Sequence, residues 1–251
     1  MLGGYQSRPR SGSHRVMTGF APRSSRHTQF FAVATLLLLL SGFVHAVEWV
    51  PVAEEPRHRL VFENEEAVVL DVHLPPGYVS LYHEHKIDLL YVTIVGTQVW
   101  AEALNGQRME ADVPTGDLRF SSDNHGLPHI HRVGNVGERP FHIIGVGSKG
   151  ASVVNPEFVP IEGDTEGLLL EQEKSHVQVY RISLQPGEAT GEHHHNLPHT
   201  HVFLTDGVIS DGTNGATAVS AGQFLWQPGN THHRYINKSQ QVLEIVEVQW
   251  R

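Results

Sequence analysis

The stretch LPPGYVSLYHEH at residues 74–85 returns as LQPGEATGEHHH at residues 184–195. Each copy has a leucine, a Pro-Gly pair, five further residues and then His-x-His, and the two copies lie 110 residues apart. A second shared segment follows each of them, HRVGN from His131 and HRYIN from His233. A long repeat of this kind predicts two copies of one folded unit, each with three histidines in the same order.

Alternation of apolar and polar residues predicts strands rather than helices. Leu70, Val72 and Leu74 alternate with Asp71 and His73, and clusters of Gly, Pro, Asn and Asp separate such runs. A period of two with frequent turn residues is typical of antiparallel sheets, and no run after residue 46 has a convincing helical period. We therefore expect an all-β protein, a sandwich or barrel with short strands.

Strand geometry gives the histidines a chemical meaning. In a strand, residues i and i+2 point to the same face, so both members of each His-x-His project together. A third histidine on a neighbouring strand completes a set of neutral imidazoles that suits a divalent Fe, Mn, Zn, Cu or Ni ion and leaves coordination positions open. The sequence thus predicts two metal sites: His83, His85 and His131, and His193, His195 and His233.

These segments resemble the two motifs of the cupin superfamily. The first motif is Gly-(x)5-His-x-His-(x)3-4-Glu-(x)6-Gly, and its opening, Gly-(x)5-His-x-His, is matched from Gly77 and again from Gly187. The end of the second motif, His-(x)3-Asn, is matched at residues 131–135 and 233–237. The resemblance covers about residues 58–250 and implies a bicupin, with two tandem jelly-roll barrels that each hold a metal ion.

The chain departs from the first motif at its glutamate, which is missing from both copies. Asp88 stands near the place of the acid in the first copy, and His199 is the alternative fourth ligand in the second. The other interpretation is that both sites use three histidines alone, as some iron dioxygenases of the superfamily do.

The third histidine of each site has a competitor in the sequence. His129 competes with His131, and His232 competes with His233. We prefer His131 and His233, because each is followed by arginine and lies four residues before an asparagine.

The first 46 residues are typical of a secretory signal peptide. Arginines without any acid precede an apolar run from Phe30 to Val44, and Val44-His45-Ala46 offers small residues for cleavage. The run is short of the roughly 20 residues that span a bilayer, although an uncleaved anchor and a start at Met17 stay open. After this leader helix we expect the following division: cupin domain 1 at 54–148, a linker at 149–167 and cupin domain 2 at 168–251.

Charge and cysteine content limit the classes of partner and of metal ligand that the chain can have. Beyond residue 46, 13 Lys and Arg stand against 27 Asp and Glu, a formal charge of −14 that argues against nucleic acid and anionic membrane surfaces. The chain has no cysteine, which excludes disulfides and thiolate ligands and suits a periplasmic or secreted protein. An unpaired strand edge would favour a homodimer.

The function expected from these observations is that of an exported, metal-binding bicupin. An open metal site favours an enzyme that acts on a small molecule, and the missing glutamate favours a three-histidine dioxygenase-like oxidoreductase over a lyase or isomerase. The alternative is a non-catalytic exported protein that binds a metal or a small ligand. No catalytic base can be assigned from the sequence.

Overall fold

The computed structural model describes residues 47–120, 129–149, 160–174, 176–212 and 215–250. The described residues form almost entirely β-structure, as expected, with one short 3-10 turn at Val52–Glu54. The predicted leader helix and signal peptide lie outside the described residues. Among the described residues, no helix is long and apolar enough to cross a membrane.

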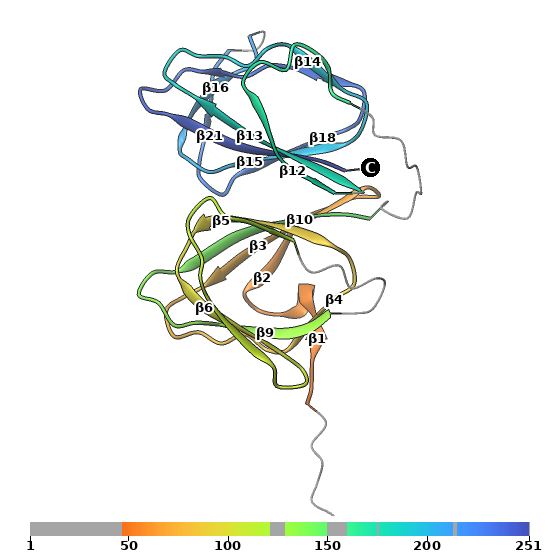
Figure 1. Ribbon diagram of the computed structural model, residues 1–251, viewed down its shortest axis with the longest axis vertical. Helices are drawn as coiled ribbons and strands as arrows, with labels where there is room; N and C mark the ends of the chain where they lie inside the picture. The colour runs from red at the N-terminus through yellow and green to blue at the C-terminus, as the bar shows by residue number, and fades with distance from the viewer. Residues whose placement is uncertain (1–46, 121–128, 150–159, 175, 213–214, 251) are drawn as a thin grey trace, which may run out of the picture. The chain divides into compact units, whose positions relative to one another are not determined.

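The first half of the chain forms two five-stranded sheets (Figure 1). One has the order β1-β4-β9-β6-β7 and the other the order β2-β3-β10-β5-β8. The strands are β1 (Val50–Pro51), β2 (His58–Glu63), β3 (Ala67–Leu74), β4 (His83–His85), β5 (Leu89–Val95), β6 (Gln98–Ala103), β7 (Arg108–Asp112), β8 (Leu118–Phe120), β9 (His129–Asn135) and β10 (Phe141–Ser148).

The second half repeats this arrangement with one sheet of five strands and two of three. Their orders are β12-β13-β21-β15-β18, β11-β14-β19 and β17-β16-β20. The strands are β11 (Glu162–Gly163), β12 (Leu168–Lys174), β13 (Val177–Leu184), β14 (His193–His195), β15 (His199–Phe203), β16 (Gly207–Ser210), β17 (Thr217–Val219), β18 (Phe224–Gln227), β19 (Thr231–His233), β20 (Ile236–Asn237) and β21 (Leu243–Trp250).

The last strand of the second half, β21, is buried on both faces. In β21, Val246 and Val248 belong to a core cluster with residues of both barrels, whereas Leu243 and Ile245 belong to the core inside the second barrel. Successive residues of a strand point to opposite faces, so Glu247 and Gln249 share the inward parity of Ile245. This orientation places the carboxylate of Glu247 inside the second barrel.

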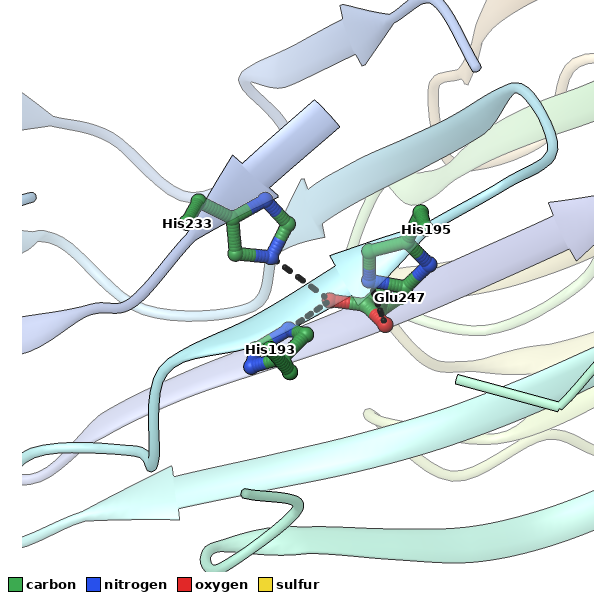
Figure 2. Close-up of side chains that lie close together, drawn as sticks. All are labelled: His193, His195, His233 and Glu247. Atoms are coloured by element: carbon green, nitrogen blue, oxygen red, sulfur yellow. Dashed lines mark ion pairs between the residues drawn. The ribbon is translucent and has the colours of Figure 1, made fainter. Parts of the chain in front are cut away.

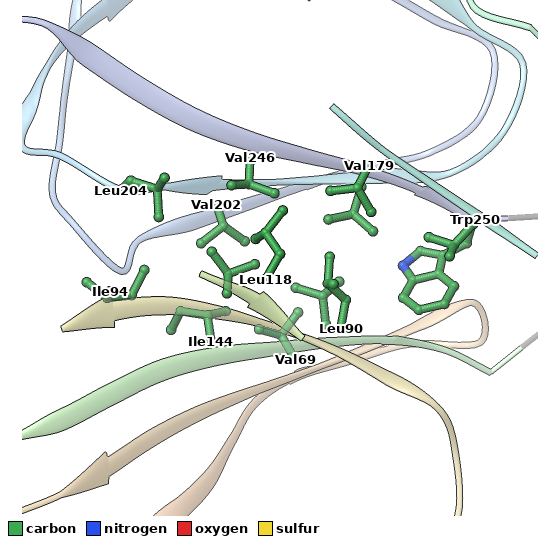
Figure 3. Close-up of a cluster of buried hydrophobic side chains, with 14 residues drawn as sticks. Val69, Leu90, Ile94, Leu118, Ile144, Val179, Val202, Leu204, Val246 and Trp250 are labelled. Atoms are coloured by element: carbon green, nitrogen blue, oxygen red, sulfur yellow. The ribbon is translucent and has the colours of Figure 1, made fainter. Parts of the chain in front are cut away.

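The two barrels share one hydrophobic core (Figure 3). Val69, Leu90 and Val146 of the first barrel and Val179 and Val246 of the second are all fully buried in it. At about 25 cal/mol per Å² of apolar surface removed from water, such a shared core favours cooperative folding of both barrels. The two barrels therefore form one compact unit from Val47 onward.

Candidate metal centres

The first histidine set lies on two paired strands. His83 and His85 occupy the short strand β4, and His131 lies opposite His83 in the antiparallel strand β9. The Nε2 atoms of His85 and His131 are 3.2 Å apart, and the three histidines offer ligand atoms that all lie within 4.8 Å of one another. The structure therefore brings together the three residues predicted for this site.

The orientation of His83 suits metal binding. Its Nδ1 lies 2.9 Å from the carbonyl oxygen of Leu81, so Nδ1 carries the proton and donates it. Nε2 then has the lone pair, and it is buried without a hydrogen-bond partner. A buried nitrogen lone pair without a partner is costly unless a ligand occupies the site, and an ion satisfies it.

Burial keeps this first set of histidines uncharged. Desolvation lowers the pKa of His83 to about 3 and that of His85 to about 2, and it lowers the pKa of His131 well below the usual value. Neighbouring imidazoles add to the effect in each case. The three rings are therefore neutral at physiological pH, the state in which imidazole binds metals.

Further polar residues surround the first set. His129 Nε2 lies 3.0 Å from His131 Nδ1, so the competitor supports His131 from outside the set. The ring of His58 lies 4.2 Å from that of His83, and His58 Nδ1 is 2.6 Å from a carboxylate oxygen of the buried Glu55. The sequence provides no spacing signal for this His58–Glu55 pair.

The second histidine set includes a carboxylate (Figure 2). His193 and His195 lie on β14, and His233 lies opposite His193 on β19. Glu247 of β21 points between them: its Oε2 is 3.8 Å from His193 Nε2 and 3.5 Å from His233 Nε2, and its Oε1 is 3.2 Å from His195 Nε2. The predicted triplet is thus brought together, and a fourth ligand group joins it.

Hydrogen bonds on the far side of the rings leave the inner nitrogens available. His193 Nδ1 donates to the carbonyl oxygen of Gly191 at 3.0 Å, and His195 Nδ1 donates to Gln249 Oε1 at 2.7 Å. The Nε2 atoms of both histidines and Oε1 of Glu247 are buried without a hydrogen-bond partner. Acceptor atoms that face one another in a dry site repel unless a cation lies between them.

The separations also fit an ion. Ligand atoms around a tetrahedral ion with bonds of about 2.1 Å stand roughly 3.4 Å apart. The Glu247 oxygens lie 3.2, 3.5 and 3.8 Å from the three histidine nitrogens. These residues fit a divalent metal ion with little rearrangement.

The electrostatics of the second set centre on Glu247. Burial alone would raise the pKa of this carboxyl, but the interactions with the surrounding histidines, among them the hydrogen bond with His201, outweigh burial and hold the pKa well below its usual range. Burial alone would lower the pKa of His193, but the interaction with Glu247 outweighs burial and raises this pKa. For His233 the effect of burial is larger than that of Glu247, and the pKa of His233 falls to about 4. A buried anion therefore faces a neutral His233 and a His193 whose proton affinity it raises.

His201 and Tyr235 hold the carboxylate in place. His201 Nε2 donates to Glu247 Oε2 at 2.9 Å, and the Tyr235 hydroxyl donates to His201 Nδ1 at 3.1 Å. Burial raises the pKa of Tyr235, so the hydroxyl keeps its proton. The proton on His201 Nε2 is used on Glu247, which makes His201 a support for the carboxylate rather than a ligand.

The two residues predicted as additional ligands, His199 and Asp88, lie at different distances from the histidine sets. His199 is fully buried beside the second set, with its ring stacked 3.9 Å from that of His195, and its ligand atom groups with those of His201 and His233. Asp88 does not reach the first set. The residue lies just before β5, and its carboxylate is 43% exposed and 3.9 Å from His176.

The two barrels differ at the positions of Glu247 and His201. In the repeat, Gly145 corresponds to Glu247 and Tyr91 corresponds to His201. Gly145 and Tyr91 lie opposite each other on β10 and β5, as Glu247 and His201 do on β21 and β15. A side chain at Gly145 would press against the Tyr91 ring at 3.2 Å. The Tyr91 hydroxyl lies 3.3 Å from His85 Nδ1. The first barrel therefore has three histidines backed by a tyrosine, without a carboxylate in the group.

A cavity of about 580 Å³ reaches the second set at His233. His233 and Tyr235 contribute to its wall, together with Arg234, Gln223 and Phe203. The volume suits a small organic molecule. A ligand in this cavity would contact His233.

Glu247 is the functional residue that sequence reasoning missed. The motif places the acid shortly after His-x-His, where the second copy has His199, but the structure supplies the carboxylate from the last strand. A signal was present: Leu243, Ile245 and Glu247 share one strand face, so the acid interrupts an apolar, inward-facing row. His201, which the sequence left unassigned, belongs to the same group.

Comparison with known proteins supports the fold. No protein-family model matches the chain, and no curated protein matches its sequence. Among solved structures, AerE from Microcystis aeruginosa matches with a TM-score of 0.56 at 12% identity, over 78% of this chain and 98% of that one. Bacillus subtilis oxalate decarboxylase, studied for its Mn(II) centres, matches with a TM-score of 0.53 at 15% identity, over 74% and 69%. A tryptophan-to-tyrosine variant of that decarboxylase scores 0.54 at 15% identity, over the same shares.

Proposed function

We propose that this bicupin is a metal-dependent enzyme whose reactive centre lies in the second barrel and acts on a small organic acid. The observation that carries the proposal is Glu247, a fully buried carboxylate that faces His193, His195 and His233 beside an open cavity. We assign these four residues as the ligands. A divalent ion held there would supply a Lewis acid that polarises a bound oxygen group.

The residues of the chain contribute position and charge. The low pKa of Glu247 keeps it ionised, so the site remains one negative charge richer than the first barrel. The His201–Tyr235 pair fixes the orientation of this carboxylate at 2.9 and 3.1 Å. Arg234 is a cation in the wall of the cavity, which Glu192 and Asp211 also line, and its guanidinium is the group that would pair with the carboxylate of an acid substrate.

The choice of metal and substrate class follows from these ligands. Imidazoles with a carboxylate accept Mn and Fe as well as Zn, whereas the expected three-histidine dioxygenase rested on the absence of an acid. Because a solved structure with the same fold is an oxalate decarboxylase with Mn(II) centres, Mn(II) and small dicarboxylic acids are the first to test.

The test is reconstitution of the metal-free chain with Mn(II), Fe(II), Cu(II), Ni(II) or Zn(II), without oxygen. Carbon dioxide release and oxygen uptake are then measured over a panel of small acids that begins with oxalate. Turnover that requires one of these metals and is lost in Glu247→Gln supports the proposal. Glu102→Gln is the control, because Glu102 pairs with Arg108 and Arg132 away from the metal sites. No turnover with any metal would overturn it.

The non-catalytic alternative keeps the same ligands but requires that no coordination position be open to a substrate. Water-proton relaxation of the Mn(II)-loaded protein separates the two, since an enzyme needs an exchangeable position. In either case we propose export, with residues 1–46 as the signal peptide, and peptide mass spectrometry of the secreted protein would locate its first residue.

A further inference from the structure

A further group of metal-ligand residues lies on the outer face of the first barrel. Asp71 and His73 are two residues apart on β3, so they share a face, and His142 lies directly opposite His73 on β10. The three side chains offer ligand atoms that all lie within 4.8 Å of one another. Neither the cupin motifs nor the proposed function involves them.

Both imidazoles converge on one carboxylate oxygen. Asp71 Oδ1 lies 3.0 Å from His142 Nε2 and 3.3 Å from His73 Nε2, while Asp71 Oδ2 accepts a hydrogen bond from Arg59 at 3.1 Å. These separations approach the roughly 3.4 Å expected between ligands of a tetrahedral zinc ion. A zinc ion that replaced the Nε2 protons of His73 and His142 would therefore require small rotations of these two imidazole rings.

The site is partly enclosed and faces the second barrel. The side chains of Asp71 and His142 are 17% and 13% exposed, and His73, at 48%, provides the solvent-facing side. A Cβ at Gly222 of the second barrel would come within 2.6 Å of the His142 ring. Gly222 also has a φ of +84°, so glycine suits this close approach.

The group is particular to the first barrel. The repeat places Arg181, Ser183 and Glu244 at the equivalent positions of the second barrel. Arg181 there pairs with Glu171 and donates to the carbonyl oxygen of Gly116 in the first barrel. One barrel thus contacts its neighbour through an arginine and the other through His142 beside Asp71.

We propose that Asp71, His73 and His142 form a third metal site, which binds Zn(II) with two imidazoles and a carboxylate and leaves a position for water. The bound ion holds the His142 ring in the contact with Gly222. The site steadies the contact between the barrels and does not take part in the reaction of the second barrel.

The experiment compares zinc content in the full-length chain without a histidine tag. Metal-free protein is equilibrated with excess Zn(II), freed of unbound metal by gel filtration and analysed for zinc per chain. We expect His73→Gln and Asp71→Asn each to bind one zinc fewer than the unaltered chain. His176→Gln is the matched control, because His176 also lies beside a carboxylate, that of Asp88 at 3.9 Å, but belongs to no group of metal-ligand residues in the part of the chain that the structure describes, and it should keep the full content.

Two outcomes would overturn the proposal. Equal zinc content in the unaltered chain and His73→Gln would show that the group binds no ion. Loss of zinc in His73→Gln but not in Asp71→Asn would show simple adsorption to surface imidazoles. Peptide mapping of His73 and His142 after diethyl pyrocarbonate treatment adds an independent readout, since Zn(II) should protect both residues in the unaltered chain and neither in Asp71→Asn.

Discussion

A single pair of equivalent positions separates the chemistry of the two barrels. Glu247 places a charge inside the second barrel, whereas Gly145 leaves that space in the first to the ring of Tyr91. Around these positions the His-x-His geometry is nearly the same, with each leading histidine donating Nδ1–H to the carbonyl oxygen two residues earlier. The difference between a three-histidine set and one with a carboxylate therefore arises at the last strand.

Removal of the Tyr235 hydroxyl tests the support of Glu247. Tyr235→Phe should weaken metal binding in the second barrel by about 10- to 100-fold, the usual effect of losing an outer-shell partner, because His201 loses the donor that orients it. Competition with a chromophoric chelator measures the affinity. Tyr82→Phe, which removes a hydroxyl bonded to Glu102, should leave the affinity unchanged, and an equal effect of both variants would contradict the assignment.

Acid should destabilise the metal-free protein through the first histidine set. The pKa values of His83 and His85 fall to about 3 and 2 in the folded chain, from 6.5 for an ordinary histidine, so below pH 6.5 the unfolded chain binds more protons. The stability is fully present above pH 6.5 and declines as pH falls toward 3, by about 1.4 kcal/mol per pH unit for each such histidine.

Urea unfolding at pH 7.5, 6 and 5 measures this dependence. His83→Asn should show a shallower loss, because one titrating group is gone. A stability that does not change between pH 6.5 and 5 would contradict the burial of neutral imidazoles.

At the scale of elements, the asparagine of the second motif acts as a clamp. Asn135, at the end of β9, donates from Nδ2 to the carbonyl oxygens of Leu74 and Arg139, and its Oδ1 accepts from the N–H of Gly137. Asn237 makes the same bonds to Leu184, Gln241 and Ser239. The pattern His-(x)3-Asn thus joins a metal-site residue to a residue that fixes the neighbouring strand.

Truncation of this clamp should lower stability. Asn135→Ala leaves buried backbone groups without partners, and we expect the free energy of unfolding to fall by about 2–4 kcal/mol. Denaturant titration of the metal-free protein measures it. Asn105→Ala, in an exposed turn where Oδ1 accepts one bond from Gln107, should cost at most about 0.5–1 kcal/mol, and similar losses in both variants would argue against the clamp.

At the scale of the whole molecule, the barrels are tied by a common core and by reciprocal edge contacts. Leu90 and Val92 of the first barrel pack in the same cluster as Val179 and Val248 of the second. Single-domain barrels would expose these faces to water. We therefore expect both barrels to unfold in one transition.

Leu90→Ala tests this coupling. The side chain is fully buried, so its truncation should cost about 2–5 kcal/mol and lower the unfolding midpoint of both barrels together. Scanning calorimetry shows whether the transition stays single. Leu169→Ala, at 66% exposure, should change the midpoint little, and a Leu90→Ala protein with two separated transitions would contradict a shared core.

The sequence by itself determined the β-class of the protein, the duplication and the two histidine triplets, since strand period and fixed spacing are local properties of the chain. It did not reveal Glu247 or His201, because these residues reach the second site through β21 and β15, which pair with each other although the two residues lie 46 positions apart in the chain. It did not reveal the His58–Glu55 pair, because these residues precede the first motif and only the fold brings His58 against His83. It placed Asp88 near the first site by spacing alone, yet Asp88 lies just before β5 with its carboxylate 43% exposed and close to His176. Alternate residues of β21 form two rows, one that faces the inside of the second barrel and one that faces the first barrel. Tertiary packing decided which row faces which way, because both rows are rich in apolar residues and the sequence cannot distinguish two buried faces.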